Sequence, residues 1–131
     1  MRKKIEIKSD PENLHIVEKL IDEMTEKQQI ESDLYGKILV ATIEAVNNAI
    51  IHGNKSDANK KVCIDVNTEE GEVKIRIRDE GEGFDYKKVP DPTAPENIEN
   101  IHGRGVFLMT RLSDGIRFND KGTEVEMTFK I

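Results

Sequence analysis

The stretch EAVNNAIIHGNK, residues 44–55, places polar side chains in a segment that is otherwise apolar. On a helix of 3.6 residues per turn, Glu44, Asn48 and His52 recur every four residues and form one stripe. A buried polar group without a partner costs roughly 1–3 kcal/mol, so the stripe predicts a bound ligand or an internal network. We favour a ligand for the stripe, whereas Asn47 alone fits a solvated position.

Each residue of this stripe offers a different chemistry. Asn48 carries a neutral amide oxygen, which suits Mg²⁺ because this ion prefers oxygen donors and shares its shell with waters and phosphates. Glu44, one turn earlier, could accept a proton from a water or hydroxyl placed against a γ-phosphate. His52, near the end of the helix, fits a structural role equally well.

A second group of candidates lies where the strand pattern ends, in DEGEGFD. Asp79 continues the period of the preceding apolar residues, and Gly81 and Gly83 permit close approach of a backbone. A carboxylate only accepts hydrogen bonds, so it suits an amino group such as adenine N6 and rejects guanine, which has an oxygen there. Taken alone, the segment fits a plain turn equally well.

A third candidate is the run Gly103, Arg104 and Gly105, which we expect to precede a helix over residues 106–114. The free N–H groups and positive dipole end of a helix start favour anions. Arg104 and Lys55 could add charge to such a phosphate site, although each is by default a surface residue. Neither GxxxxGK[ST] nor the complete dinucleotide fingerprint occurs, so a nucleotide would bind by another scheme.

Hydrophobic alternation predicts the strands that must position these residues. The alternating segments are 2–8, a hairpin over 60–79 that turns at TEEG, then GIRF and residues 123–131, which are joined by the DKG turn.

Helical spacing predicts two long helices before the hairpin. The first follows a start cluster in which either Ser9 or Asp10 is the cap, and the second runs from Asp33 to about His52, capped by Ser32 and ended by Gly53. Residues 86–103 form a proline-bearing loop with a short helix at 96–101. The sum is an α+β two-layer sandwich, in which helices cover one face of a mostly antiparallel or mixed sheet.

The composition indicates one globular domain over residues 1–131. The chain is 36% hydrophobic and 35% charged, without an apolar run for a bilayer or a secretory signal. We therefore expect a cytoplasmic protein with no membrane partner. The net charge of −6 and the scarcity of aromatic residues argue against nucleic acid. The lone Cys63 is expected as a small buried side chain without a role.

Taken in order, EAVNNAIIHGNK, DEGEGFD, GRGVFLM and KGTEVEM resemble the four nucleotide-binding boxes of the GHKL (Bergerat-fold) ATPase superfamily, a histidine-kinase-like ATP-binding domain. The loop PDPTAPENI leading into GRGVFLMTRLSD resembles the anti-sigma regulatory factor and serine-protein kinase family, of the RsbW and SpoIIAB type. The resemblance runs from about residue 5 to the end of the chain. Four boxes in this order and spacing are specific, whereas any one of them is weak.

This resemblance implies an ATP and Mg²⁺ site in which Glu44 is the general base, Asn48 the Mg²⁺ ligand and Asp79 the adenine contact. Two glycines of the second box would shape the adenine pocket, the third box would be the hinge of a lid over the phosphates, and Thr123 would support the adenine contact. The predicted nucleotide-binding residues are Asn48, His52, Lys55, Asp79, Gly81, Gly83, Gly103, Arg104, Gly105, Val106 and Thr123.

The function that this resemblance implies is partner switching. The protein would bind a sigma factor or another target, and would use Mg-ATP to phosphorylate a serine on a small STAS-type antagonist. A homodimer is also implied. The sequence shows no phosphoacceptor helix pair, sensor or transducer domain, which disfavours a complete sensor histidine kinase or a gyrase-like ATPase. Two alternatives stay open: an ATP-gated binding module without turnover, and an interaction domain with a degenerate site.

Overall fold

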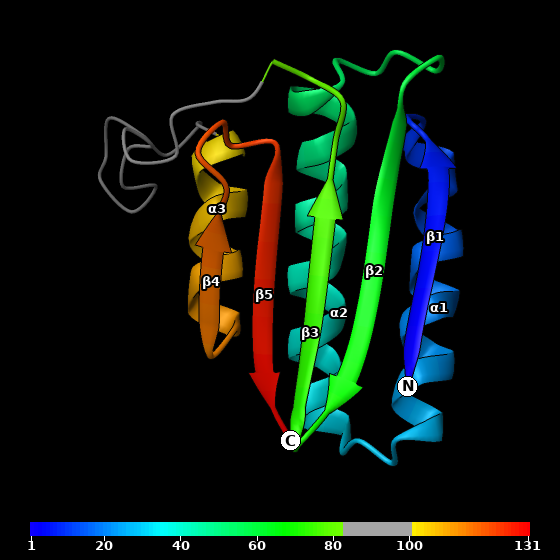
Figure 1. Ribbon diagram of the computed structural model, residues 1–131, viewed down its shortest axis with the longest axis vertical. Helices are drawn as coiled ribbons and strands as arrows, with labels where there is room; N and C mark the ends of the chain where they lie inside the picture. Colours follow the sequence, from blue (N-terminus) through cyan, green and yellow to red (C-terminus); the bar gives the residue numbers. More distant parts are fainter. Residues whose placement is uncertain (83–100) are drawn as a thin grey trace.

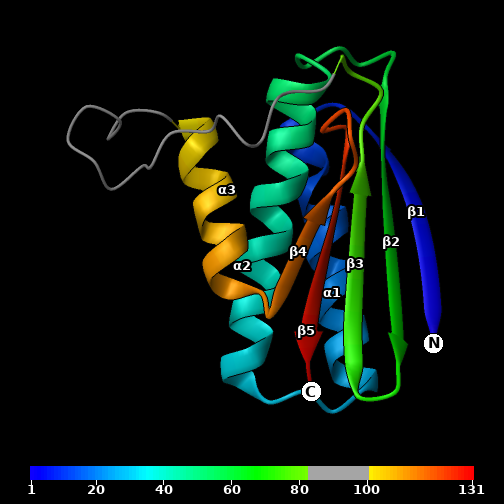
Figure 2. The ribbon, with the colours of Figure 1, turned by 60° about the vertical axis from the view of Figure 1, so that its left-hand side comes forward.

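Neighbouring strands of the sheet are antiparallel throughout. The computed structural model describes residues 1–82 and 101–131, with side chains in the second range from residue 105 on. In these ranges five strands form one sheet in the order β1-β2-β3-β5-β4, with helices against one face (Figures 1 and 2). The predicted α+β two-layer architecture is confirmed. The strands are β1 (Arg2–Lys8), β2 (Lys61–Glu69), β3 (Glu72–Arg78), β4 (Gly115–Phe118) and β5 (Glu124–Lys130).

Tight turns set the register of these strands. The β2–β3 hairpin turns at Glu70 and Gly71, whose φ angles are 51° and 78°. Positive φ at both central positions is the geometry that matches the twist of a two-residue hairpin. Gly122, with φ 72°, serves the turn that precedes β5. Both predicted turns are confirmed.

The first helix, α1 (Leu14–Lys27), follows a short 3₁₀ turn, η1 (Pro11–Asn13). The Asp10 side chain accepts the N–H of Glu12 and so caps this turn. Ser9 does not cap it, because its hydroxyl is buried and donates to the carbonyl of Lys60. The structure thus resolves the two candidate caps in favour of Asp10.

The central helix, α2 (Ser32–Asn48), continues into a wider π-helical turn, η2 (Ala49–Gly53). The predicted end near His52 is therefore correct. The predicted cap is wrong, because Ser32 is the first helical residue and Glu31 occupies the cap position without a side-chain bond. The run Ser32–Gly53 has the length and hydropathy of a membrane span, but here it is the helix that packs on the middle of the sheet (Figure 2).

The hydrophobic core lies between α2 and the sheet. Ile38 and Val46 of this helix and Ile50 of η2 are fully buried, as are Ile75 of β3 and Met127 of β5. Residues from α1 and α3 join the same cluster. One face of α2 is thereby fixed against the sheet, and this sets the direction in which its polar residues point.

The third helix, α3 (Ile101–Leu112), begins five residues earlier than predicted. Gly103, Arg104 and Gly105 therefore lie inside its first turns and do not precede it. The sequence suggested a break because glycine in a helix interior costs about 1 kcal/mol relative to alanine. Close packing of α3 on α2 at Gly105, described below, outweighs this propensity.

The face of the sheet opposite the helices is covered by charged side chains. Arg2 pairs with Asp65 at 2.9 Å, and Glu126 pairs with both Arg76 at 2.8 Å and Arg117 at 3.1 Å. Cys63 also lies on this face and is only half-buried, so the expectation of a buried thiol is wrong. Strand alternation explains this, because its neighbours in the chain are the ones that face the core.

Candidate functional site

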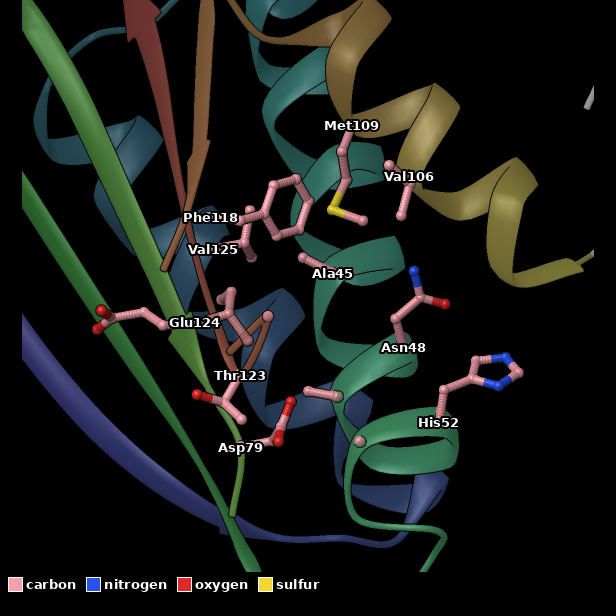
Figure 3. A pocket seen from close by; sticks show the side chains of 14 residues that line it. Ala45, Asn48, His52, Asp79, Val106, Met109, Phe118, Thr123, Glu124 and Val125 are labelled. Carbon is pink, nitrogen blue, oxygen red and sulfur yellow. The ribbon is translucent and has the colours of Figure 1, made fainter. Parts of the chain in front are cut away.

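A pocket lies between the C-terminal end of α2 and the adjoining ends of β3 and β5, with α3 as its third wall (Figure 3). Helix and sheet contribute opposite walls, so residues far apart in the sequence meet across it. The lining residues are Ala45, Asn48, Ala49, His52, Gly53, Ile77, Asp79, Val106, Met109, Phe118, Gly122, Thr123, Glu124 and Val125.

Asp79 lies on the sheet side of the pocket, directly after β3. Its backbone N–H donates to the carbonyl of Thr123 at 2.9 Å, and its carboxylate Oδ1 accepts the N–H of Gly81 at 2.8 Å. Burial raises the pKa of Asp79, an effect that the Gly81 N–H and the charge of Lys60 partly oppose. A carboxylate has about four acceptor sites, so this group can accept a further donor from within the pocket.

Thr123 lies beside Asp79 in the same wall (Figure 3). The side chain of Asn119 bonds both the side chain and the backbone of Thr123. Asn119 Nδ2 donates to Thr123 Oγ1 at 2.9 Å, and Asn119 Oδ1 accepts the Thr123 N–H at 2.9 Å. Asn119 is not among the site residues predicted from the sequence. An asparagine three residues before Gly122 in a turn is the signal that could have found it.

Asn48 faces this wall from the last position of α2. Its Nδ2 atom is buried and has no hydrogen-bond partner among the residues that the structure describes. A Cβ atom at Gly105 would lie 2.6 Å from Asn48 Nδ2, so α3 can pack here only because residue 105 is glycine. A buried amide without a partner is costly, and a polar ligand in the pocket would satisfy it.

Two glycines pack closely around Asp79, at positions where a side chain would not fit. A Cβ atom at Gly53 would lie 2.4 Å from Asp79 Oδ2, and one at Gly81 would lie 1.9 Å from the carbonyl oxygen of Gly53. The predicted close approach at Gly81 is therefore present. Gly53 is predicted from the sequence only as the end of a helix, and its contact with the carboxylate is a finding of the structure.

Of the other predicted site residues, some line the pocket and some do not. Val106 lines the pocket, and so does His52, although its ring points away from Asp79 (Figure 3). Partial desolvation lowers the pKa of His52, which favours the neutral imidazole at pH 7. Glu44 is half-buried and Lys55 is exposed, and neither belongs to the lining residues. Gly83 lies outside the described residues, and of Gly103 and Arg104 only the helical backbone is described.

The enclosed part of the pocket is small. Its volume is about 40 Å³, against roughly 300 Å³ at the lower end of ligand pockets. Met109 and Phe118 form the apolar end opposite Asp79 (Figure 3). A planar base that enters between these groups must separate them, and a flexible methionine permits such adjustment.

The described residues supply few ligands for a metal ion. Among the described residues, no three His, Cys, Asp or Glu side chains converge on one point. Asn48 offers a single neutral oxygen, so a metal ion here would depend on waters and phosphate oxygens for the rest of its shell. Mg²⁺ is commonly bound in this way.

Comparison with known proteins identifies the family. The sequence model of one protein family, the histidine kinase-like ATPase domain, matches residues 7–129. A serine-protein kinase RsbW of Bacillus licheniformis is 30% identical, over 95% of this chain and 83% of that protein. The RsbW of Bacillus subtilis is 26% identical, over 95% and 82% respectively. An anti-sigma F factor of Clostridium botulinum is 36% identical, over 75% of this chain and 72% of that protein.

Proposed function

The chain belongs to the histidine kinase-like ATPase domain family, and from this premise we propose that it is an ATP-binding anti-sigma regulator that acts as a serine-protein kinase in a partner-switching circuit. The names of its relatives support both the kinase and the regulator. The observation that carries the proposal is that Asp79 and Thr123 meet Asn48 across one pocket, and that Asn48 Nδ2 has no partner within the described part of the chain.

In this proposal the adenine lies against the wall formed by β3 and β5. The Asp79 carboxylate accepts a hydrogen bond from the 6-amino group, while Thr123 contacts the same edge of the ring. A guanine presents a carbonyl oxygen there and would meet an acceptor with an acceptor. Burial of the carboxylate strengthens the discrimination, because an unpaired buried polar group is costly.

The triphosphate then runs along α2, away from the Gly53 end. Asn48 would hold Mg²⁺, and Gly103 to Gly105 with Arg104 would face the phosphates from α3. The first four N–H groups of a helix have no intrahelical partner, and in α3 these include the N–H groups of residues 101–103. Bound Mg²⁺ would supply charge neutralisation of the phosphate oxygens.

Glu44 lies one turn, about 5.4 Å along the helix, beyond Asn48. A residue in this position would be near the γ-phosphate and not near the adenine, which accounts for its absence from the lining residues. There it would accept the proton of the substrate serine as the hydroxyl oxygen attacks the γ-phosphorus, and ADP would leave.

Several finer parts of the proposal rest on family membership. These are the sigma factor or equivalent target, a STAS-type antagonist as the phosphate acceptor, a homodimer, and a cytoplasmic location. The relatives named anti-sigma F factor support the first of these. The antagonist follows from the kinase, since a protein kinase requires a protein acceptor.

One observation favours a second candidate function. Because Glu44 does not line the pocket, the site could bind ATP without using this carboxylate. The protein would then be an ATP-gated binding module, in which the nucleotide sets partner affinity without turnover.

A capture experiment followed by a kinase assay separates the two functions. Proteins retained from the native cell with and without ATP are identified, and the captured antagonist is tested for phosphoserine by mass spectrometry. We expect Glu44→Ala to bind Mg-ATP normally but to transfer phosphate at least about 100-fold more slowly. Glu69→Ala, on an exposed residue of β2 beside the hairpin turn, is the matched control.

Normal transfer by Glu44→Ala would remove the residue from its role. Tight ATP binding without any phosphoserine on the captured partners would select the binding module.

A further inference from the structure

The side chain of Asn54 is a buried polar group beside the nucleotide pocket, and its hydrogen bonds are all made. The residue follows η2 and is only 1% exposed. Its Nδ2 donates to Ser9 Oγ at 2.7 Å and to the carbonyl of Lys61 at 3.0 Å, while its Oδ1 accepts the N–H of Glu80 at 2.7 Å. Both amide hydrogens and the amide oxygen are therefore used.

These hydrogen bonds join three segments that are distant in the sequence. Ser9 lies between β1 and η1, Lys61 begins β2, and Glu80 lies in the turn that follows β3. A second hydrogen bond joins the turn after β3 to β2, because the Glu80 carboxylate accepts the N–H of Lys61 at 2.8 Å. Asn54 thus fixes the turn after β3 to the rest of the sheet.

The turn held in this way is the one that carries Asp79. The Glu80 N–H that Asn54 accepts belongs to the peptide on the C-terminal side of Asp79, while the Asp79 N–H is held by the carbonyl of Thr123 at 2.9 Å. The backbone is therefore anchored on both sides of the carboxylate. On the chain itself Asn54 also follows Gly53, the residue whose Cα faces Asp79 Oδ2.

We propose that Asn54 is a positioning residue that aligns Asp79 for the nucleotide base and so sets the preference of the site for a 6-amino purine. This inference rests on the proposed function, because it assumes that a nucleotide binds at Asp79. Asn54 itself does not line the pocket, so it acts only through the turn. An apolar side chain cannot replace it, because the Glu80 N–H and the Lys61 carbonyl would both lose this partner, and polar groups that lose a hydrogen bond on folding destabilise the protein.

The test compares two ligands in each variant: ATP and purine riboside triphosphate, which lacks only the 6-amino group. Calorimetry in the presence of Mg²⁺ gives the ratio of the two dissociation constants. We expect a ratio of about tenfold or more in the wild type, which corresponds to one hydrogen bond to a charged group. In Asn54→Ala the ratio falls toward one, because a displaced Asp79 no longer distinguishes the ligands.

Two further variants separate positioning from general stability. Asn54→Asp keeps the acceptor for the Glu80 N–H but loses both donated bonds, so it should melt at a lower temperature and yet retain the wild-type ratio. Asn13→Ala removes a single exposed hydrogen bond to the carbonyl of Lys8 and should change neither quantity. If Asn54→Ala does not fold, Asn54→Ser is used with the same expectation, since its hydroxyl is too short to reach Glu80.

The possible results distinguish failure of this inference from failure of the proposed function. An unchanged ratio in a folded Asn54→Ala or Asn54→Ser variant overturns the inference and leaves the proposed function intact. Equal affinities of the wild type for the two ligands also overturn it, because there is then no discrimination to set. Failure of the wild type to bind ATP at all contradicts the proposed function itself.

Discussion

Asp79 shows how one residue can be unfavourable for the fold and suited to a ligand. The pocket removes its carboxylate from water, which raises its pKa, and only the Gly81 N–H and the charge of Lys60 act in the other direction. Because the folded state favours the protonated form, the ionised form reduces stability at neutral pH. A donor from a bound base would relieve this cost.

Asp79→Asn should therefore stabilise the nucleotide-free protein while impairing binding. The amide keeps an acceptor for the Gly81 N–H but carries no charge, so we expect a higher melting temperature at pH 7. The difference should shrink as the pH falls from the raised pKa of Asp79 to the ordinary pKa of an aspartate, and it should vanish below that value, where the wild-type carboxyl is protonated in both states. Affinity for ATP should fall at least about tenfold, measured by calorimetry. A melting temperature below that of the wild type at pH 7 would contradict this account.

Gly105→Ala should affect the reaction more than the fold. The new Cβ would lie 2.6 Å from Asn48 Nδ2, but an amide at the end of a side chain can rotate away, and alanine favours the helix by about 1 kcal/mol. We expect slower phosphate transfer and a higher Mg²⁺ requirement, with the melting temperature little changed. Gly36→Ala in α2, where nothing lies within 4 Å, is the control and should leave the kinase rate unchanged. Equal rates in both variants would show that the position of Asn48 is not critical.

At the scale of elements, the π-helical turn η2 decides where the helix meets the sheet. The Asn54 N–H donates to the carbonyl of Ala49, five residues earlier, at 2.8 Å. This wider turn shifts the end of the helix relative to an α-helical path, and it presents Gly53 to the carboxylate of Asp79. Such turns occur often at functional sites, and here the turn forms the edge of the pocket.

The open face of the sheet provides a second pH-dependent contribution to the stability, separate from that of Asp79. Glu126 in β5 is 15% exposed and lies between Arg76 of β3 and Arg117 of β4. The hydrogen bond from Arg76 is the main reason that the pKa of Glu126 is lowered. This contribution is fully present above the ordinary pKa of a glutamate and is lost as the pH falls through the lowered value.

Glu126→Gln should therefore destabilise the sheet by about 0.5–1 kcal/mol at pH 7. Urea unfolding measures the loss, which should decrease toward acid pH and at high salt. The control is Glu6→Gln, because its ion pair with Lys61 spans 3.8 Å between side chains that are more than half exposed. A loss at pH 7 that persists unchanged at pH 3 would point to packing and not to charge.

At the scale of the whole molecule, the site joins the two layers and so couples nucleotide binding to global stability. Asn48 belongs to the helix layer and Asp79 to the sheet layer, so a ligand that contacts both resists their separation. A ligand that binds only the folded state stabilises it by about 2.7 kcal/mol at 100 times its dissociation constant. For a chain of this length we expect Mg-ATP to raise the melting temperature by on the order of 10 °C.

The same thermal measurement checks the base preference. Mg-GTP should produce a much smaller rise than Mg-ATP, and Asp79→Asn should respond weakly to both nucleotides. Equal shifts with the two nucleotides would show that the base is not read by Asp79.

The sequence by itself determined the periodic elements and the chemistry of the separate boxes. Alternation identified the strands, and spacing identified the long helices, because burial on one face of the sheet imposes a period that is visible in the residues. The types of Asn48, Asp79 and Thr123 limited what each could bind. The roles of these three residues, like those of Glu44, Lys55 and Arg104, remain predictions.

Only the tertiary structure decided which of these residues meet and what holds them. Propensity placed the start of α3 five residues too late, because the contact of Gly105 with Asn48 is not local. Asn54 and Asn119 carry no periodic signal, and each is significant only through partners that folding brings to it. Hydrophobic pattern is a property of neighbouring residues, whereas a buried polar network depends on distant ones, and this is why the site was less predictable than the fold.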